Sequence, residues 1–373
     1  MAGTNNRRAG DLFEGLVRFA EVLRGSSIDL EPYDPARHGS IASPTAPGDF
    51  DEVDTYWLNA PFAYASIRYD EATDEYHYVA VEPDLDDLER DLLEFGTYSL
   101  EQMAYLWMAI EHNKNVIFAG GTASGKTTSM NAVSMFIPPR SKLITIEDTR
   151  ELSLYHDNWL SSVTRERLSE GSNVTMYDLL RSALRHRPEY ILVGEVRGEE
   201  AITLFQAMNT GHTTLSTMHA DSVQTVINRL ENEPINVPRP MVQSLDVLCV
   251  QVLARFGDER VRRSQAIAEI EGMDQRTGEL DYSTAYEWTA ADDTFREGNR
   301  GLMDEIREER GWSQSRLLRE LRRRRRVLQY LQERAVNGYR EFTAMVNRYY
   351  ANPERVMQHI DESDAALEPE EAD

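Results

Sequence analysis

The sequence feature that most constrains this chain is a glycine-rich loop placed between an apolar run and an amphipathic stretch. The apolar run covers residues 116–119 and the amphipathic stretch covers residues 130–136. A buried strand, a loop and a helix are therefore predicted in that order, which is the context in which the pattern G-x-x-x-x-G-K-[ST] binds nucleotide phosphates. The loop itself reads Gly120-Gly121-Thr122-Ala123-Ser124-Gly125-Lys126-Thr127-Thr128.

The residue types in this loop predict how it binds phosphate. Each of its three glycines permits a positive φ, so successive backbone N–H groups can turn inward and form a cradle for phosphate oxygens. The helix that begins near Gly125 directs its positive dipole end at the same place. Lys126 can reach the β- and γ-phosphates, and the Thr127 hydroxyl is placed to ligate Mg²⁺. Thr128 is expected to contact the α-phosphate, so ATP and Mg²⁺ are the predicted ligands.

Two later predicted strands end in acidic residues. The strand over residues 143–146 is followed by Glu147, and the strand over residues 190–193 is followed by a glycine and Glu195. Acids at the carboxyl ends of strands face the ligand crevice of an α/β sheet. An apolar strand ending in an acid is also the Walker B arrangement, whose carboxylate holds the metal through water or polarises the attacking water. We expect Glu195 to act on the water and the metal, with Glu147 as the rival for the catalytic role.

Histidines and arginines near these acids are further candidates. His212 and His219 flank the predicted strand over residues 213–217, which would put one or both imidazoles near the γ-phosphate. A histidine is more often a structural hydrogen-bonding group, and no third ligand lies at zinc spacing, so a zinc site is not expected. Arg197 follows Glu195 by two residues. Arg197, like Arg150 and Arg185, is as well placed for pairing with a neighbouring acid as for catalysis.

Charge limits the partners of the chain. Its 64 acidic and 40 basic residues give a net charge of −24. Such a surface repels nucleic acid and suits concentrated salt, so a helicase is disfavoured and a halophilic setting is expected. The arginine cluster 322–326 lies among apolar residues at helical spacing, which predicts a solvated helix face paired with acids. The single cysteine, Cys249, excludes an internal disulfide and indicates a reduced cytoplasmic setting.

Apolar spacing outside the loop predicts further elements. No apolar run is long enough to span a membrane, and the N-terminus carries no signal-peptide core. A capping box at Ser99 opens a helix with Met103, Leu106, Trp107 and Ile110 on one buried face. The remaining predicted elements are helices over 12–23, 84–93 and 177–187, strands over 62–69, 75–81, 261–270 and 280–288, and helices that begin at Leu302, Ser313, Tyr339 and Pro353.

The run from Leu93 to about Ala254 resembles the core of the type II/type IV secretion ATPases, and most of all the archaeal members that drive type IV pilus or archaellum assembly. The resemblance rests on four boxes in the order of the family, which together are far more specific than any one of them. They are the Walker A loop 120–128, the acidic box 146–152, the Walker B variant 191–197 and the histidine box 211–220.

This resemblance implies a RecA-like α/β P-loop ATPase core that forms a hexameric ring, hydrolyses ATP between subunits and passes the motion to a membrane platform protein. It also implies a cytoplasmic protein, peripheral at the inner face of the cell membrane. The catalytic residues that follow from the matching boxes and the strand-end acids are Glu195, Glu147, Lys126, His219 and Arg197.

Three regions follow from this comparison. We expect a shortened α+β N-terminal region over residues 1–92, the RecA-like core over 93–256 and C-terminal strands and helices over 257–373. In the family a ring-building domain with its own arginines precedes the core, and most of it looks missing here. Two hypotheses therefore stand, a working pilus-assembly or secretion ATPase and a catalytically weak nucleotide-binding subunit that acts as a regulatory or assembly partner.

Overall fold

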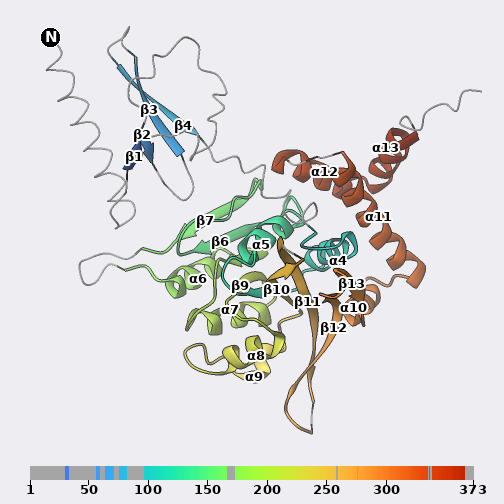
Figure 1. Cartoon of the computed structure of the whole chain (residues 1–373). Helices are drawn as coiled ribbons and strands as arrows, with labels where there is room; N and C mark the ends of the chain where they lie inside the picture. The colour runs from blue at the N-terminus through green and yellow to red at the C-terminus, as the bar shows by residue number, and fades with distance from the viewer. Residues whose placement is uncertain are drawn as a thin grey trace, which may run out of the picture. The chain divides into compact units, whose positions relative to one another are not determined.

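A computed structural model of the chain divides into two compact units (Figure 1). One comprises residues 1–85 with 166–173, and the other residues 86–165 with 174–373. The structure describes four short strands between residues 30 and 81, and then residues 96–165, 173–257, 259–274, 276–334, 336 and 338–365. Each unit is described by itself. The three-region division expected from the sequence remains a proposal.

Two antiparallel strand pairs are described in the first unit. Tyr64 of β3 pairs with Val81 of β4, and Asp70 pairs with Glu75. This confirms the predicted hairpin, although the first strand begins two residues later than expected. The predicted helices over 12–23 and 84–93 lie outside the described residues. The strands are β1 (Leu30–Pro32), β2 (Tyr56–Leu58), β3 (Tyr64–Asp70) and β4 (Glu75–Val81).

A nine-stranded sheet forms the centre of the second unit, with the order β13-β12-β11-β10-β5-β9-β8-β6-β7. The strands from β10 to β7 in this order pair in parallel, and β11, β12 and β13 extend the sheet antiparallel. The predicted C-terminal strands therefore continue the sheet of the core. The strands are β5 (Val116–Gly120), β6 (Leu143–Glu147), β7 (Trp159–Val163), β8 (Tyr190–Val193), β9 (Thr213–Met218), β10 (Val247–Phe256), β11 (Glu259–Met273), β12 (Leu280–Thr289) and β13 (Thr294–Glu297).

Helices cover both faces of this sheet, which explains why its central strands are apolar on both sides. Val116 and Phe118 of β5 contribute to one core, while Ile117 and Ala119 contribute to the other. The first core is covered by α4 (Leu100–Glu111), α5 (Lys126–Ser134), α10 (Gly301–Glu309), α11 (Gln314–Glu333), α12 (Tyr339–Ala351) and α13 (Pro353–Ala365). The second core is covered by α6 (Met176–Arg185), α7 (Glu200–Asn209) and α8 (Val223–Glu231), beside the short α9 (Arg239–Val242). This arrangement confirms the predicted α/β class.

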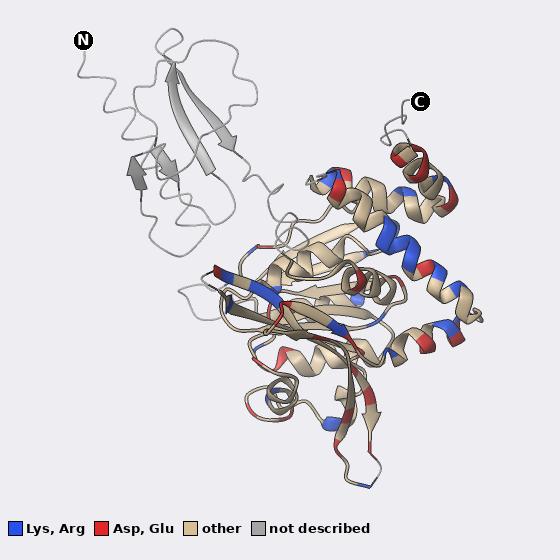
Figure 2. Cartoon of the chain, turned by 45° about the vertical axis from the view of Figure 1, so that its right-hand side comes forward, with Lys and Arg blue, Asp and Glu red and all other residues tan. Residues whose placement is uncertain are grey.

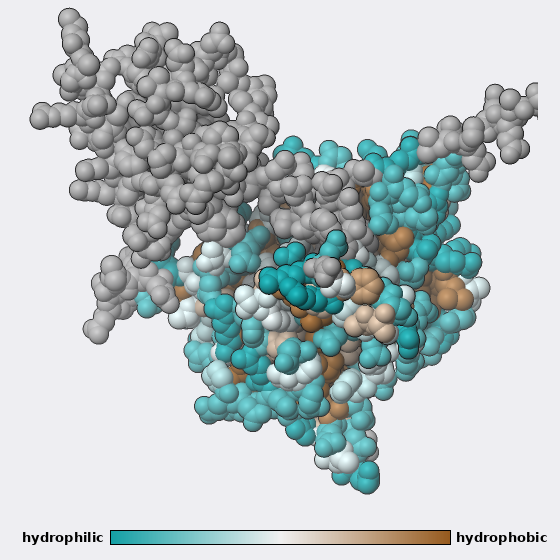
Figure 3. All heavy atoms as spheres, in the orientation of Figure 1, coloured by the Kyte–Doolittle hydropathy of each residue, from teal (hydrophilic) through white to brown (hydrophobic). Residues whose placement is uncertain are grey.

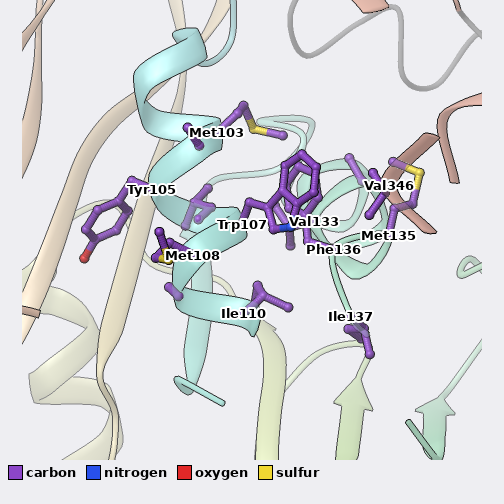
Figure 4. Close-up of a cluster of buried hydrophobic side chains, with 14 of the residues drawn as sticks. Met103, Tyr105, Trp107, Met108, Ile110, Val133, Met135, Phe136, Ile137 and Val346 are labelled. Carbon is purple, nitrogen blue, oxygen red and sulfur yellow. The ribbon is translucent and has the colours of Figure 1, made fainter. Parts of the chain in front are cut away.

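The helix α4 begins with the predicted capping box. The Ser99 hydroxyl accepts from the Gln102 backbone N–H, and the Gln102 side chain accepts from the Ser99 N–H. The sequence predicted one buried face, but residues 102–110 are all buried. The reason is that α4 lies inside the first core, where Trp107 stacks on Phe136 with ring centroids 4.9 Å apart (Figure 4).

The four predicted C-terminal helices are confirmed as α10 to α13, and the arginine cluster lies on α11 (Figure 2). Its arginines do pair with acids, as expected: Arg323 contacts Glu354, and Arg325 contacts Glu101. The expectation of a solvated face is wrong for Arg324, whose side chain is only 3% exposed. Its guanidinium contacts the carboxylates of Glu111 and Glu320 and lies over the rings of Trp107 and Tyr349.

The described surface is mostly hydrophilic, as Figure 3 shows for one face. Among the described residues, no helix is long and apolar enough to cross a membrane. Cys249 is fully buried in β10, where it belongs to the first core as a small apolar residue.

Candidate functional site

The carboxyl edge of the parallel strands brings the predicted site residues together. Ala119 pairs with Met218, Val193 pairs with Ser216, and Ile146 pairs with Val193. The loop after β5, the acids at the ends of β6 and β8 and the segment after β9 therefore leave the sheet at the same edge. This is where ligands bind in open α/β sheets.

The backbone of the glycine-rich loop differs in detail from the prediction. Gly125 has a φ of +93°, but the other residue in the left-handed region is Ala123, with a φ of +60°, and neither Gly120 nor Gly121 has a positive φ. Gly120 is required for a different reason. A Cβ at this position would lie 2.3 Å from Ser124 Oγ and 2.6 Å from a carbonyl oxygen of β10. A glycine is therefore needed at position 120 because the loop and the neighbouring strand β10 approach each other closely.

The start of α5 has the features of an anion site. Its N-cap is Gly125, which has no side chain to cap the helix. The N–H groups of a first helical turn have no partner within the helix, so here they are left to a ligand, and the helix dipole favours an anion at this end. The loop and the nine-residue helix that follows thus fit the phosphates of a nucleotide.

Lys126 lies over the loop. Its Nζ donates to the carbonyl of Gly121 at 2.8 Å. The Lys126 side chain is partly buried, and this burial lowers the pKa of its ammonium. Among nearby charges, that of Glu195 has the largest opposing effect and raises the pKa of this ammonium.

The threonines of the loop are not fully buried. Thr127 and Thr128 are half-buried at the start of α5, and Thr122 is exposed. No group of three or more His, Cys, Asp or Glu that could hold a metal occurs in the part of the chain that the structure describes.

Glu147 is buried at the end of β6. Its Oε1 accepts from the backbone N–H groups of Glu151 and Leu152, at 2.8 and 2.9 Å. Its Oε2 is buried without a partner, and burial raises the pKa of the Glu147 carboxyl. A Cβ on Gly194 would lie 3.3 Å from Cγ of Glu147, so the segment directly after β8 passes close to this side chain.

Glu195 is more accessible than Glu147. Its side chain is 26% exposed and pairs with the guanidinium of Arg197, which also approaches Asp148 at 3.7 Å. The expected pairing of Arg197 with neighbouring acids is thus present. Arg150, by contrast, lies over the ring of Trp159.

The two histidines are separated by the length of β9. His219 follows the carboxyl end of this strand and is exposed, and its carbonyl accepts from the Arg229 guanidinium. His212 precedes the amino end, where its Nδ1 contacts the carbonyl of Ala207 and the Thr210 hydroxyl. The possibility that both imidazoles lie near the γ-phosphate is therefore wrong for His212, because a parallel strand places its two ends at opposite edges of the sheet.

Two residues at the loop were not predicted from the sequence. Gln251 lies beside Gly120 in the register of β10 and β5, and its Nε2 donates to Ser129 Oγ at 2.6 Å. Arg262 of β11 donates from Nε to the carbonyl of Ala123 at 3.0 Å. No local motif marks either residue, since each reaches the loop from a strand more than a hundred residues further along the chain.

Comparison with known proteins matches most of the chain. A family model described as type II/IV secretion system protein matches residues 83–338, and one described as PilB3-like, N-terminal matches residues 10–84. The expectation that most of a ring-building domain is missing remains a prediction, because neither match tests it.

Several proteins are similar in sequence. An uncharacterized protein of Methanocaldococcus jannaschii is 43% identical over 261 residues, which cover 69% of this chain and 96% of that protein. A second from the same organism is 39% identical over 264 residues, covering 69% of this chain and 48% of its own length. The type IV secretion system protein PtlH of Bordetella pertussis is 38% identical over 174 residues, covering 43% of this chain and 51% of PtlH. The chain thus spans about half of the latter two relatives.

Solved structures also align with the chain. The VirB11 ATPase of the Brucella suis type IV secretion system, crystallised with sulphate, has 25% identity and a TM-score of 0.39 over 57% of this chain and 72% of its own. The pilus retraction motor PilT with bound ADP has 24% identity and a TM-score of 0.36 over 72% of this chain and 70% of its own.

Proposed function

Because the chain belongs to the type II/IV secretion system protein family, we propose that it binds Mg·ATP at the loop 120–128 and hydrolyses it to power a pilus, archaellum or secretion machine. The observation that carries this proposal is the uncapped start of α5, which lies with Lys126 at the same sheet edge as Glu195 at the end of β8. ATP and Mg²⁺ are proposed ligands, and ATP supplies the phosphoanhydride bond that is cleaved.

In this proposal the loop N–H groups hold the phosphates and Lys126 leaves the Gly121 carbonyl to neutralise the β- and γ-oxygens. The Thr127 hydroxyl would hold the metal directly and Glu195 would hold it through water; Glu195 would also take the proton from the attacking water. His219 and Arg197, at the same edge, are proposed to sense or stabilise the charge at the γ-phosphate.

Sheet geometry supports Glu195 over Glu147 as the base. One strand, β9, separates β5 from β8, whereas β6 lies one strand further away. Neighbouring strands are about 4.8 Å apart, so β8 ends roughly 10 Å from the loop strand and β6 roughly 14 Å from it. A γ-phosphate and a water fit into the shorter gap.

The unpaired Oε2 of Glu147 favours the competing assignment, because an unsatisfied buried carboxylate oxygen is typical of functional sites.

The wider role is also proposed from the family. The chain would act at the cytoplasmic face of the cell membrane, where it would contact a platform protein of the machine. It would form a ring with identical subunits or with full-length relatives. Nucleic acid is not a proposed partner. A second candidate, a catalytically weak nucleotide-binding subunit, is supported by the engagement of Arg197 with Glu195 and Asp148, which leaves this arginine paired within its own chain.

The substitution Lys126→Ala tests nucleotide binding. We expect it to abolish binding or hydrolysis of ATP and to leave the thermal unfolding midpoint nearly unchanged, because the side chain contacts a loop carbonyl and not the core. Retention of ATP binding and hydrolysis at the wild-type level would contradict the proposed function.

A further inference from the structure

Arg262 contacts the glycine-rich loop 120–128, called the phosphate loop below, from a strand that lies outside all four sequence boxes. Its Nε donates to the carbonyl oxygen of Ala123 at 3.0 Å. Its Cδ would lie 3.4 Å from a Cβ placed on Gly125, so the aliphatic part of the side chain lies close to Gly125 at the end of the loop. The side chain as a whole is exposed, so its packing adds little to the core.

The strands β10 and β11 hold Arg262 in this place. β10 pairs with the loop strand β5, with Gln251 beside Gly120, and β11 pairs with β10, with Arg262 opposite Leu253. The same hairpin makes a second contact, from Gln251 to the Ser129 hydroxyl in α5. The hairpin therefore contacts both the loop and the helix that follows it.

The contacted loop residue is the strained one. Ala123 has a φ of +60°, a conformation that costs a residue with a Cβ about 1–2 kcal/mol. In a phosphate cradle the N–H groups converge inward and the carbonyls point outward. The hydrogen bond from the Arg262 guanidinium to the outward carbonyl of Ala123 therefore stabilises the loop conformation that binds phosphate. Lys126 makes a similar contact with Gly121, but it is needed at the phosphates once a nucleotide is bound.

We propose that Arg262 is a positioning residue that holds the loop in its phosphate-binding conformation before the nucleotide arrives. This inference rests on the proposed nucleotide site. A loop that is already ordered loses less conformational freedom on binding, so its affinity for ATP and for ADP is higher by the same factor. The hairpin β10–β11 would then set nucleotide affinity without contacting the reacting phosphate.

The test compares Arg262→Ala and Arg262→Lys with Arg260→Ala, in the full chain at molar salt. Arg260 is exposed on the same strand and pairs with Arg255 in the hairpin register, so it controls for the loss of a positive charge. For Arg262→Ala we expect the Kd of Mg·ATP and of Mg·ADP to rise about tenfold, the size of one charge-assisted hydrogen bond. The kcat at saturation and the thermal midpoint should stay near wild type, and Arg262→Lys should recover part of the affinity.

Hydrogen exchange gives a readout that needs no nucleotide. In the nucleotide-free protein, amides of residues 120–128 should exchange faster in Arg262→Ala than in wild type and in Arg260→Ala. Unchanged exchange and affinity would overturn the inference, and so would a lower kcat at unchanged Kd or an equal loss in Arg260→Ala. A wild-type chain that binds no nucleotide would contradict the proposed function, while the exchange experiment would still decide whether Arg262 orders the loop.

Discussion

The two acids at the sheet edge can be separated by one pair of matched substitutions. Glu195→Gln keeps the shape of the side chain but cannot accept a proton from water, so we expect turnover to fall by about 10²–10⁴-fold while ATP stays bound. Its pair with Arg197 is exposed, so the free energy of unfolding should change by less than about 1 kcal/mol. A loss of turnover with intact folding and binding would identify a chemical role.

Glu147→Gln is the matched control. The amide oxygen can still accept from the N–H groups of Glu151 and Leu152, and the substitution removes a charge whose burial raises the pKa of the carboxyl. We therefore expect stability and ATP affinity close to wild type and turnover reduced far less than in Glu195→Gln.

The assay is single-turnover hydrolysis of Mg·ATP at molar salt, with affinity measured by titration of a fluorescent ATP analogue and stability by urea unfolding. The assignment would be reversed if Glu147→Gln stopped hydrolysis while Glu195→Gln hardly changed it. In that case the unpaired Oε2 of Glu147 would be the atom that accepts the proton, and the strand-spacing argument would be wrong.

Three further predictions concern stability and assembly. In urea unfolding, Arg324→Ala should lower the free energy of unfolding by about 3–5 kcal/mol, because it leaves Glu111 without its buried partner. The control Arg325→Ala removes a half-exposed ion pair and should lower this free energy by less than about 1 kcal/mol. Burial raises the pKa of Asp246 to about 6. The stability that the protonated carboxyl contributes is therefore complete below about pH 4, and about 2–3 kcal/mol of the free energy of unfolding is lost as the pH rises through about 6. Asp246→Asn should flatten that loss in unfolding measured from pH 4 to 7, and an unchanged slope would refute the assignment. In sedimentation at molar salt with ATP, the isolated chain should form a ring poorly and hydrolyse slowly, and a stable hexamer with fast, concentration-independent turnover would contradict this.

The parts of the fold that the sequence predicted are those with a local signal. The strand–loop–helix unit at Lys126 and the strand Tyr190–Val193 were predicted because apolar runs, glycines and acids adjoin one another along the chain. The capping box at Ser99 is local in the same way. The strands β7 and β13 were not predicted, since both are short and only partly buried, so neither shows the continuous apolar run of a central strand.

Contacts between distant segments could not be predicted in this way. A run of five arginines is typical of an exposed helix face, but Arg324 is buried because α4 presents Trp107 and Glu111 to it from more than two hundred residues away. Arg262 belongs to the same category, since only the register of β11 on β10 brings it to Ala123. The positive φ of Ala123 also lacks a signal, because glycines on either side of it satisfy the usual pattern.

The two edges of the sheet are held by different contacts, and this difference bears on the proposed function. At the amino edge, Asp246 accepts from both nitrogens of Asn115, whose side-chain oxygen accepts from the Thr214 N–H, and Lys114 pairs with Glu305 of α10. Lys114, Asn115 and Asp246 are buried or half-buried, whereas Glu305 is exposed, and these contacts join β9 and α10 to the segments before β5 and β10. At the carboxyl edge, most side chains of the loop 120–128 and of the segments after β8 and β9 are half-buried or exposed. Under the proposed function, we expect a change at the γ-phosphate to act first through these loops and through the β10–β11 hairpin.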